Sequence, residues 1–112
     1  MRIDLSEFQA GAYAEILDRL PWKVLKAGAR VNRETVSKDE TDQINDLALK
    51  TMVRAWNVKD VLGENVPLPA SATEDQIDMI DGMIIGRILS EIMKLTHGVR
   101  IDPNSGTALS MS

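Results

Sequence analysis

Few residues of this sequence have the chemistry for catalysis or for metal binding. His97 is the only histidine, and it stands beside Gly98 at the end of a predicted helix, where the helix dipole favours a positive side chain. A general base needs an orienting partner and a pocket, and the sequence indicates neither. There is no cysteine and no Asp-rich loop ending in Glu that would give His97 companion metal ligands. We therefore expect His97 to act as a helix-terminus residue.

Asp75, Asp78 and Asp81 recur at three-residue spacing. On a helix this spacing brings carboxylates to neighbouring faces, where a pair could bind a divalent ion or exchange protons. We interpret them instead as helix-start charges and solvated positions, with Asp81 at the edge of the core or paired with a base. A glycine-rich phosphate loop, Gly-x-Ser-x-Gly and a paired nucleophile and base are all absent from the sequence. We expect no enzyme, no catalytic residue, no metal and no cofactor.

A group of basic residues falls within about 80° of arc if the segment that carries it is one helix. The group consists of Arg19, Lys23, Lys26, Arg30 and Arg33. The whole chain is acidic, with 13 basic and 17 acidic residues, so broad electrostatic binding to nucleic acid or to an anionic membrane is not expected. Two interpretations of this basic face stay open, a solvated face or a contact with an acidic partner helix.

A strip of flexible and small residues lies opposite a stripe of isoleucines on the longest predicted helix. The strip consists of Met79, Gly82, Met83, Gly86, Leu89 and Met93. Methionine-rich surfaces adapt to variable helical segments, and glycines four apart let another helix approach closely. The strip is either a protein-binding surface for another helical segment, or one side of a tightly packed internal helix pair. The sequence leaves both interpretations open.

Helices are predicted to position all of these residues. Ser/Thr-x-x-Glu/Gln patterns, each able to form a capping box, begin at Ser6, Ser37 and Thr73. Together with little strand-like alternation, they favour an all-α domain of three to four helices. The expected helices cover residues 7–19, 22–31, 38–56 and 74–96.

The length of 112 residues and the 44% hydrophobic content fit a single domain. We expect one helical domain over residues 1–98, with a long Pro/Gly connection at 57–73, and a flexible tail over 99–112. No apolar run is long enough for a membrane-spanning helix, and the N-terminus does not resemble a secretory signal. A soluble cytoplasmic protein is expected.

Residues 53–69 read VRAWNVKDVLGENVPLP, follow an acidic-capped helix, and precede a helix that begins TEDQI. This stretch resembles the tail assembly chaperones of long-tailed, siphovirus-like bacteriophages, in which a Trp-Asn pair, a short Asp/Gly turn and a Pro-x-Pro segment link two helices. Here the matching positions are Trp56-Asn57, Asp60, Gly63 and Pro67-Leu68-Pro69. The resemblance covers residues 39–95, about half of the chain.

The resemblance implies a small, mostly helical protein of the host cytoplasm that is absent from the mature virion. Its implied partners are the phage tape measure protein, which it keeps soluble, the tail tube protein that later replaces it, and further copies of itself. Nucleic acid and membrane are not implied partners. Two alternatives stay open: a helical structural phage protein, such as a head–tail connector or completion protein, and a small DNA-binding regulator that uses the basic face.

Overall fold

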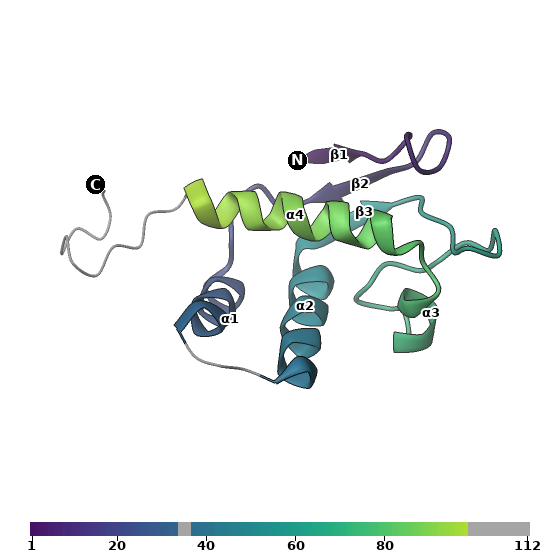
Figure 1. The fold of residues 1–112 in the computed structure, drawn as a ribbon. Coiled ribbons are helices and arrows are strands. Elements are labelled where there is room, and N and C mark those ends of the chain that lie inside the picture. The colour runs from purple at the N-terminus through teal and green to yellow at the C-terminus, as the bar shows by residue number, and fades with distance from the viewer. Residues whose placement is uncertain (34–36, 99–112) are drawn as a thin grey trace.

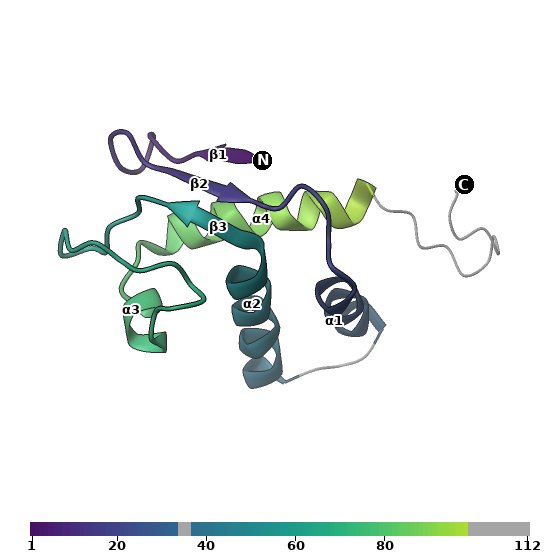
Figure 2. The same cartoon turned by 180° about the vertical axis from the view of Figure 1, so that it is seen from behind.

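The computed structural model describes residues 1–33 and 37–98, and the side chains of residues 1–28 and 37–95. In chain order the elements are β1 (Arg2–Asp4), β2 (Tyr13–Ile16), α1 (Trp22–Arg33), α2 (Lys38–Met52), β3 (Val53–Trp56), α3 (Glu74–Asp78) and α4 (Gly82–Gly98). The strands form an antiparallel sheet in the order β1-β2-β3. The long helix α4 runs along one side of this sheet, while α1 and α2 extend away from it (Figures 1 and 2). The predicted tail, 99–112, lies outside the described residues.

The all-α prediction is wrong, and the largest error lies at the N-terminus. The expected helix over 7–19 is a β-hairpin, in which Arg2 pairs with Glu15 and Asp4 with Tyr13. The buried side chains alternate with more exposed ones, as a sheet with one covered face requires, and they are Ile3, Leu5, Ala12, Ala14 and Ile16. The pattern at Ser6 does not form a capping box, because its N–H donates to the Asp4 carboxylate at 2.9 Å.

The helix predicted over 38–56 ends four residues early. Its start is confirmed, because Ser37 and Glu40 form the expected capping box. After Met52 the chain becomes extended, and β3 pairs with β2 so that Trp56 lies opposite Ala14. Valine and tryptophan favour strands. The edge of β2 supplies backbone hydrogen-bond partners, which a strand can use and a helix cannot. The tertiary pairing therefore overrides the helical periodicity.

The helix predicted over 74–96 is two helices with a break at Met79, Ile80 and Asp81. The start at Thr73 is confirmed by a capping box with Gln76. At the break, the Asp81 carboxylate accepts the Met83 N–H at 2.9 Å and its carbonyl accepts the Ile84 N–H at 2.9 Å. Asp81 thus starts α4 as an N-cap, rather than pairing with a base.

The isoleucine stripe forms the centre of the core. Ile80, Ile84, Ile88 and Ile92 are all buried, and they belong to one cluster with residues of the sheet and of α2. Because α4 contributes one apolar side to this cluster, its remaining sides are left facing solvent. This arrangement decides which residues of α4 are available to a partner.

Candidate protein-binding surface

The Met/Gly strip lies largely on the surface of the protein. Met79 is 40% exposed, Met83 66% and Met93 47%. Gly82 and Gly86 are exposed, and a Cβ added to either would meet open space. Leu89 differs, because it is half-buried and packs against the core. Within the described residues, the strip is therefore not one side of a tightly packed internal helix pair.

The break before α4 separates Met79 from the other five members of the strip, which lie on α4. At about 100° per residue, four members on α4 lie within about 60° of arc, and Met83 lies about 60° beyond them. Those four are Gly82, Gly86, Leu89 and Met93. Met79 precedes the helix, so the helical angle assumed for it from the sequence does not apply.

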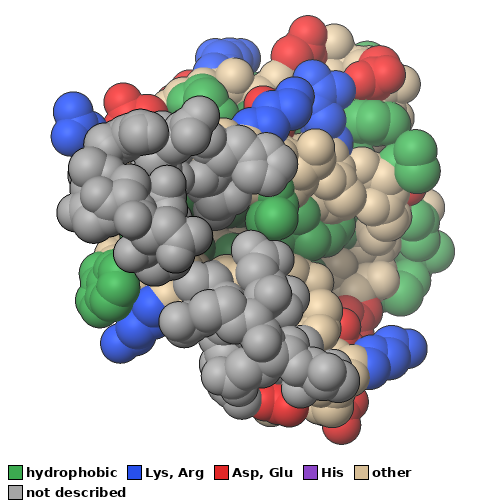
Figure 3. Space-filling view, turned by 60° about the vertical axis from the view of Figure 1, so that its left-hand side comes forward, with side chains coloured by type: hydrophobic (Ala, Val, Ile, Leu, Met, Phe, Trp, Pro, Cys, Tyr) green, Lys and Arg blue, Asp and Glu red, His purple; other side chains and the backbone are tan. Residues whose placement is uncertain are grey.

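Two exposed apolar residues beside Met79 were not predicted from the sequence. Val61 is 62% exposed and Leu62 is 72% exposed, and the Val61 N–H donates to the Met79 carbonyl at 2.9 Å. The available signal was the placement of two large apolar residues in an Asp/Gly turn, where polar residues are usual. They extend the exposed apolar surface beyond the start of α4. On the face that Figure 3 shows, hydrophobic side chains reach the surface along the right-hand edge and at separate places near the centre, the top and the lower left.

The Asp/Gly turn is fixed by its own side chain. The Asp60 carboxylate accepts the N–H groups of Leu62 and Glu64, both at 2.9 Å. Gly63 has a φ of 85°, a left-handed conformation that costs other residues steric strain. Asp60 and Gly63 therefore build a rigid turn, which presents Val61 and Leu62 to solvent.

The Trp-Asn pair ties this turn to the rest of the fold. The indole N–H of Trp56 donates to the Val66 carbonyl at 3.0 Å, which closes the connection over β3. The Asn57 side chain accepts the Tyr13 N–H at 2.8 Å and donates to the Gly11 carbonyl at 3.0 Å. Asn57 thus holds the loop of the N-terminal hairpin, more than 40 residues away in sequence.

We expect the substitution Asn57→Ala to lower the free energy of unfolding by about 1–2 kcal/mol, because two hydrogen bonds to the hairpin are lost. Urea denaturation monitored by circular dichroism measures the change. Asn65→Ala is the matched control, since Asn65 is exposed and its side chain bonds to no described residue. Equal stability of the two variants would contradict the structural role of Asn57.

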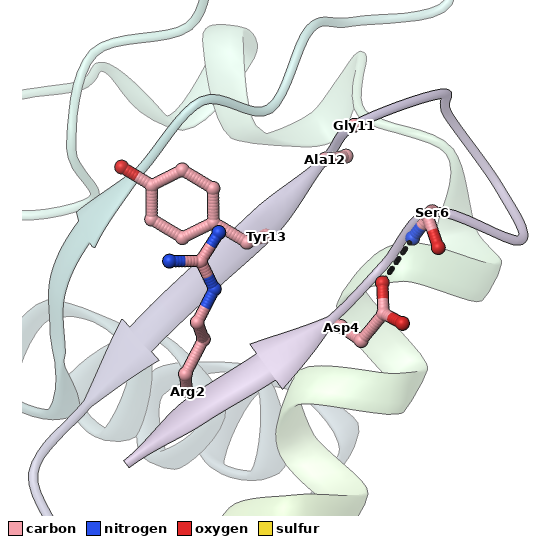
Figure 4. A pocket seen from close by; sticks show the side chains of 6 residues that line it. All are labelled: Arg2, Asp4, Ser6, Gly11, Ala12 and Tyr13. Atoms are coloured by element: carbon pink, nitrogen blue, oxygen red, sulfur yellow. Dashed lines mark hydrogen bonds between the residues drawn. The ribbon is translucent and has the colours of Figure 1, made fainter.

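A hollow of about 410 Å³ lies at the hairpin and is lined by Arg2, Asp4, Ser6, Gly11, Ala12 and Tyr13. The Arg2 guanidinium lies 4.1 Å from the centre of the Tyr13 ring. The Asp4 carboxylate accepts the Ser6 N–H at 2.9 Å, and hydrogen bonding from the Ser6 side chain, followed by that from the Ser6 N–H, lowers the pKa of Asp4. As Figure 4 shows, these charged groups interact with their neighbours instead of converging on one point. The hollow is explained by the hairpin itself.

An ion-pair network joins α4 to the hairpin. Arg87 donates to Glu7 at 2.9 Å and to Glu91 at 3.3 Å, and Lys94 donates to Glu91 at 3.1 Å. The hydrogen bond from Lys94, followed by the charges of Lys94 and the contact with Arg87, lowers the pKa of Glu91 below its ordinary value of 4.5. The network therefore stabilises the ionised form of Glu91.

This lowered pKa predicts a small stability difference that depends on pH. Above pH 4.5, the ordinary pKa of Glu91, the wild type should be more stable than Glu91→Gln by less than about 1 kcal/mol. Because the pKa is lower in the folded state, the difference should disappear as the pH falls through the folded value. Urea denaturation at neutral and acidic pH tests this, with exposed Glu64→Gln as the control. A difference that grows on acidification would contradict the assignment.

No family model, curated protein or solved structure matches this chain. Any functional assignment must therefore rest on its own residues. Among the described residues, no group of three or more His, Cys, Asp or Glu could hold a metal ion. Nor does any described helix have the length and apolar character needed to cross a bilayer.

The residues of the predicted basic face do not all lie on one helix. Arg19 lies before Pro21 and outside α1, so the assumption of one continuous helix is wrong for this residue. Lys23 and Lys26 are exposed on α1. The side chains of Arg30, Arg33 and His97 lie outside the described residues. Of the five residues of the predicted basic face, Lys23 and Lys26 are therefore the two whose side chains are described on α1.

Proposed function

We propose that this chain is a tail assembly chaperone of a long-tailed bacteriophage, which binds the tape measure protein and keeps it soluble during tail assembly. The observation that carries the proposal is the exposure of three methionine side chains, Met79, Met83 and Met93. Two exposed glycines, Gly82 and Gly86, lie on the same helix as Met83 and Met93. Single exposed apolar residues are ordinary, whereas a gathered set is typical of a binding surface. The Trp-Asn and Asp/Gly motifs add support, because they belong to the stretch that resembles these chaperones.

The chemistry of the surface suits a helical client. Exposed glycines allow the backbone of another helix to come close, and methionine side chains adapt to different apolar partners. A long helical protein would otherwise expose apolar stripes that aggregate. In this proposal several copies of the chain cover those stripes in the host cytoplasm. Tail tube protein then takes their place, so that the mature virion contains none of them.

Co-expression with the tape measure protein of the same phage, followed by native mass measurement, tests the proposal. We expect a stable complex with several copies of this chain per client. Met83→Glu should abolish or strongly weaken the complex, because it places a charge in the apolar contact. Trp22→Glu is the matched control, since Trp22 on α1 has the same exposure of 66%.

Two results would contradict the proposal. If Met83→Glu and Trp22→Glu behave alike while both remain folded by circular dichroism, the surface of α4 does not bind the client. A closed ring that forms without the client, and persists in purified virions by mass spectrometry, would favour a structural connector instead.

A further inference from the structure

A groove of about 350 Å³ lies between α2 and the α3–α4 region. Its apolar lining includes Leu49 and Ile80, which are buried, together with the half-buried Ile77, Ile85 and Leu89. Gly82 forms part of the same lining, so the groove adjoins the Met/Gly strip. An apolar lining open at the surface is typical of a site that receives side chains of another segment.

The rim of this groove has one sign of charge. Asp42, Asp46, Glu74 and Asp78 line it, and no lysine or arginine does. No described residue forms an ion pair with any of the four. Glu74 is the first residue of α3, where the helix dipole favours negative charge. The dipole therefore accounts for one of the four carboxylates.

The other three carboxylates need a different reason. Asp42 lies beyond the first turn of α2 and Asp46 lies in the middle of that helix, where the dipole has little effect. Asp78 is the last residue of α3, where the dipole disfavours negative charge. None of these three side chains makes a hydrogen bond to a described residue. Placing unpaired like charges around an apolar groove costs stability through repulsion, unless a ligand of opposite charge occupies it.

We propose that this groove binds a segment of a partner protein in which apolar side chains are flanked by lysine or arginine. The apolar side chains enter between α2 and α4, and the basic residues reach the carboxylates of the rim. Charge complementarity of this kind speeds association and selects the partner. The inference rests on the proposed function and deepens it, because it assigns the chemistry of the client segment.

The probe is a fluorescent amphipathic peptide in which leucine residues are flanked on both sides by pairs of lysines. It is compared with the same peptide in which glutamates replace the lysines. We expect the full chain to bind the lysine peptide and not the glutamate peptide. Binding should weaken as salt concentration rises, because rim charges are screened. Equal binding of the two peptides would overturn the proposal.

The double variant Asp46→Asn and Asp78→Asn should weaken binding of the lysine peptide about tenfold. The matched control is Asp18→Asn with Glu64→Gln, which makes the same change in net charge at exposed positions outside the groove. Circular dichroism confirms that both double variants are folded. Equal affinities for the two variants would overturn the assignment to the groove.

Two further results separate this inference from the proposed function. If the tape measure protein co-elutes equally with wild type and with the groove variant, the chaperone assignment stands and the groove assignment fails. If the lysine peptide binds as expected but the tape measure protein does not, the groove assignment stands and the chaperone assignment fails. A dimer that the groove variant dissociates, with peptide affinity unchanged, would assign the groove to a second copy and overturn the proposal.

Discussion

Replacement of Ile88 by alanine is expected to lower the free energy of unfolding by about 2–5 kcal/mol. The Ile88 side chain is fully buried, and it lies in the cluster that joins α4 to the sheet and to α2. Truncation removes apolar contacts and leaves a cavity beside the sheet. The paired strands of the sheet cannot easily move to fill this cavity. The free energy of unfolding of a small domain is itself small. This variant should therefore be largely unfolded at modest urea concentrations.

The matched control is Met83→Ala on the same helix, where the side chain is 66% exposed. Its effect on stability should stay within about 0.5 kcal/mol. Urea denaturation by circular dichroism compares the two. Similar losses from both substitutions would mean that the division of α4 into a buried and an open side is incorrect.

Replacement of Trp56 by alanine is expected to cost about 3 kcal/mol. The half-buried ring packs against the core, and its N–H holds the Val66 carbonyl. Loss of the ring therefore loosens both the edge strand β3 and the connection that follows it. Because that connection presents Val61 and Leu62, the proposed binding of the tape measure protein should also weaken.

Two further tryptophan variants separate the causes. Trp56→Phe keeps most of the apolar contact and should cost about 1 kcal/mol, the value of the lost hydrogen bond. Trp22→Ala should change stability by less than about 0.5 kcal/mol, because Trp22 is 66% exposed. If Trp56→Phe were as damaging as Trp56→Ala, the hydrogen bond rather than the packing would dominate.

The sequence predicted those parts of the fold that depend on local interactions. The capping boxes at Ser37 and Thr73 lie where expected, because the hydroxyl and the residue three positions later are close in sequence. The stripe Ile84, Ile88 and Ile92 is buried, as its helical spacing predicted. None of these features requires knowledge of a distant partner.

The hairpin could not be predicted in the same way. Its residues include alanine, leucine and glutamate, which favour helices, and β2 becomes a strand through pairing with residues such as Trp56, far along the chain. The break at Asp81 was hidden for a similar reason. Isoleucines recur on both sides of it, so the apolar spacing continues although the helix does not.

One property of the candidate surface, its composition, could be predicted from the sequence, and another, its exposure, could not. The composition of the strip from Met79 to Met93 was visible in the sequence, but its exposure depends on which side of α4 the sheet covers. The groove was not visible at all. It depends on bringing Asp46 of α2 and Asp78 of α3 to the lining of one groove, and no local pattern links those two residues.

The strand order also has a consequence for the protein during its synthesis on the ribosome. The middle strand, β2, pairs with β3, which is translated about 40 residues later. The apolar side chains of the sheet then share a core with Ile84, Ile88 and Ile92 of α4, which are made later still. A nascent chain that ends before α4 lacks the isoleucines that share this core, and we expect such a chain to be more prone to aggregation than the full protein.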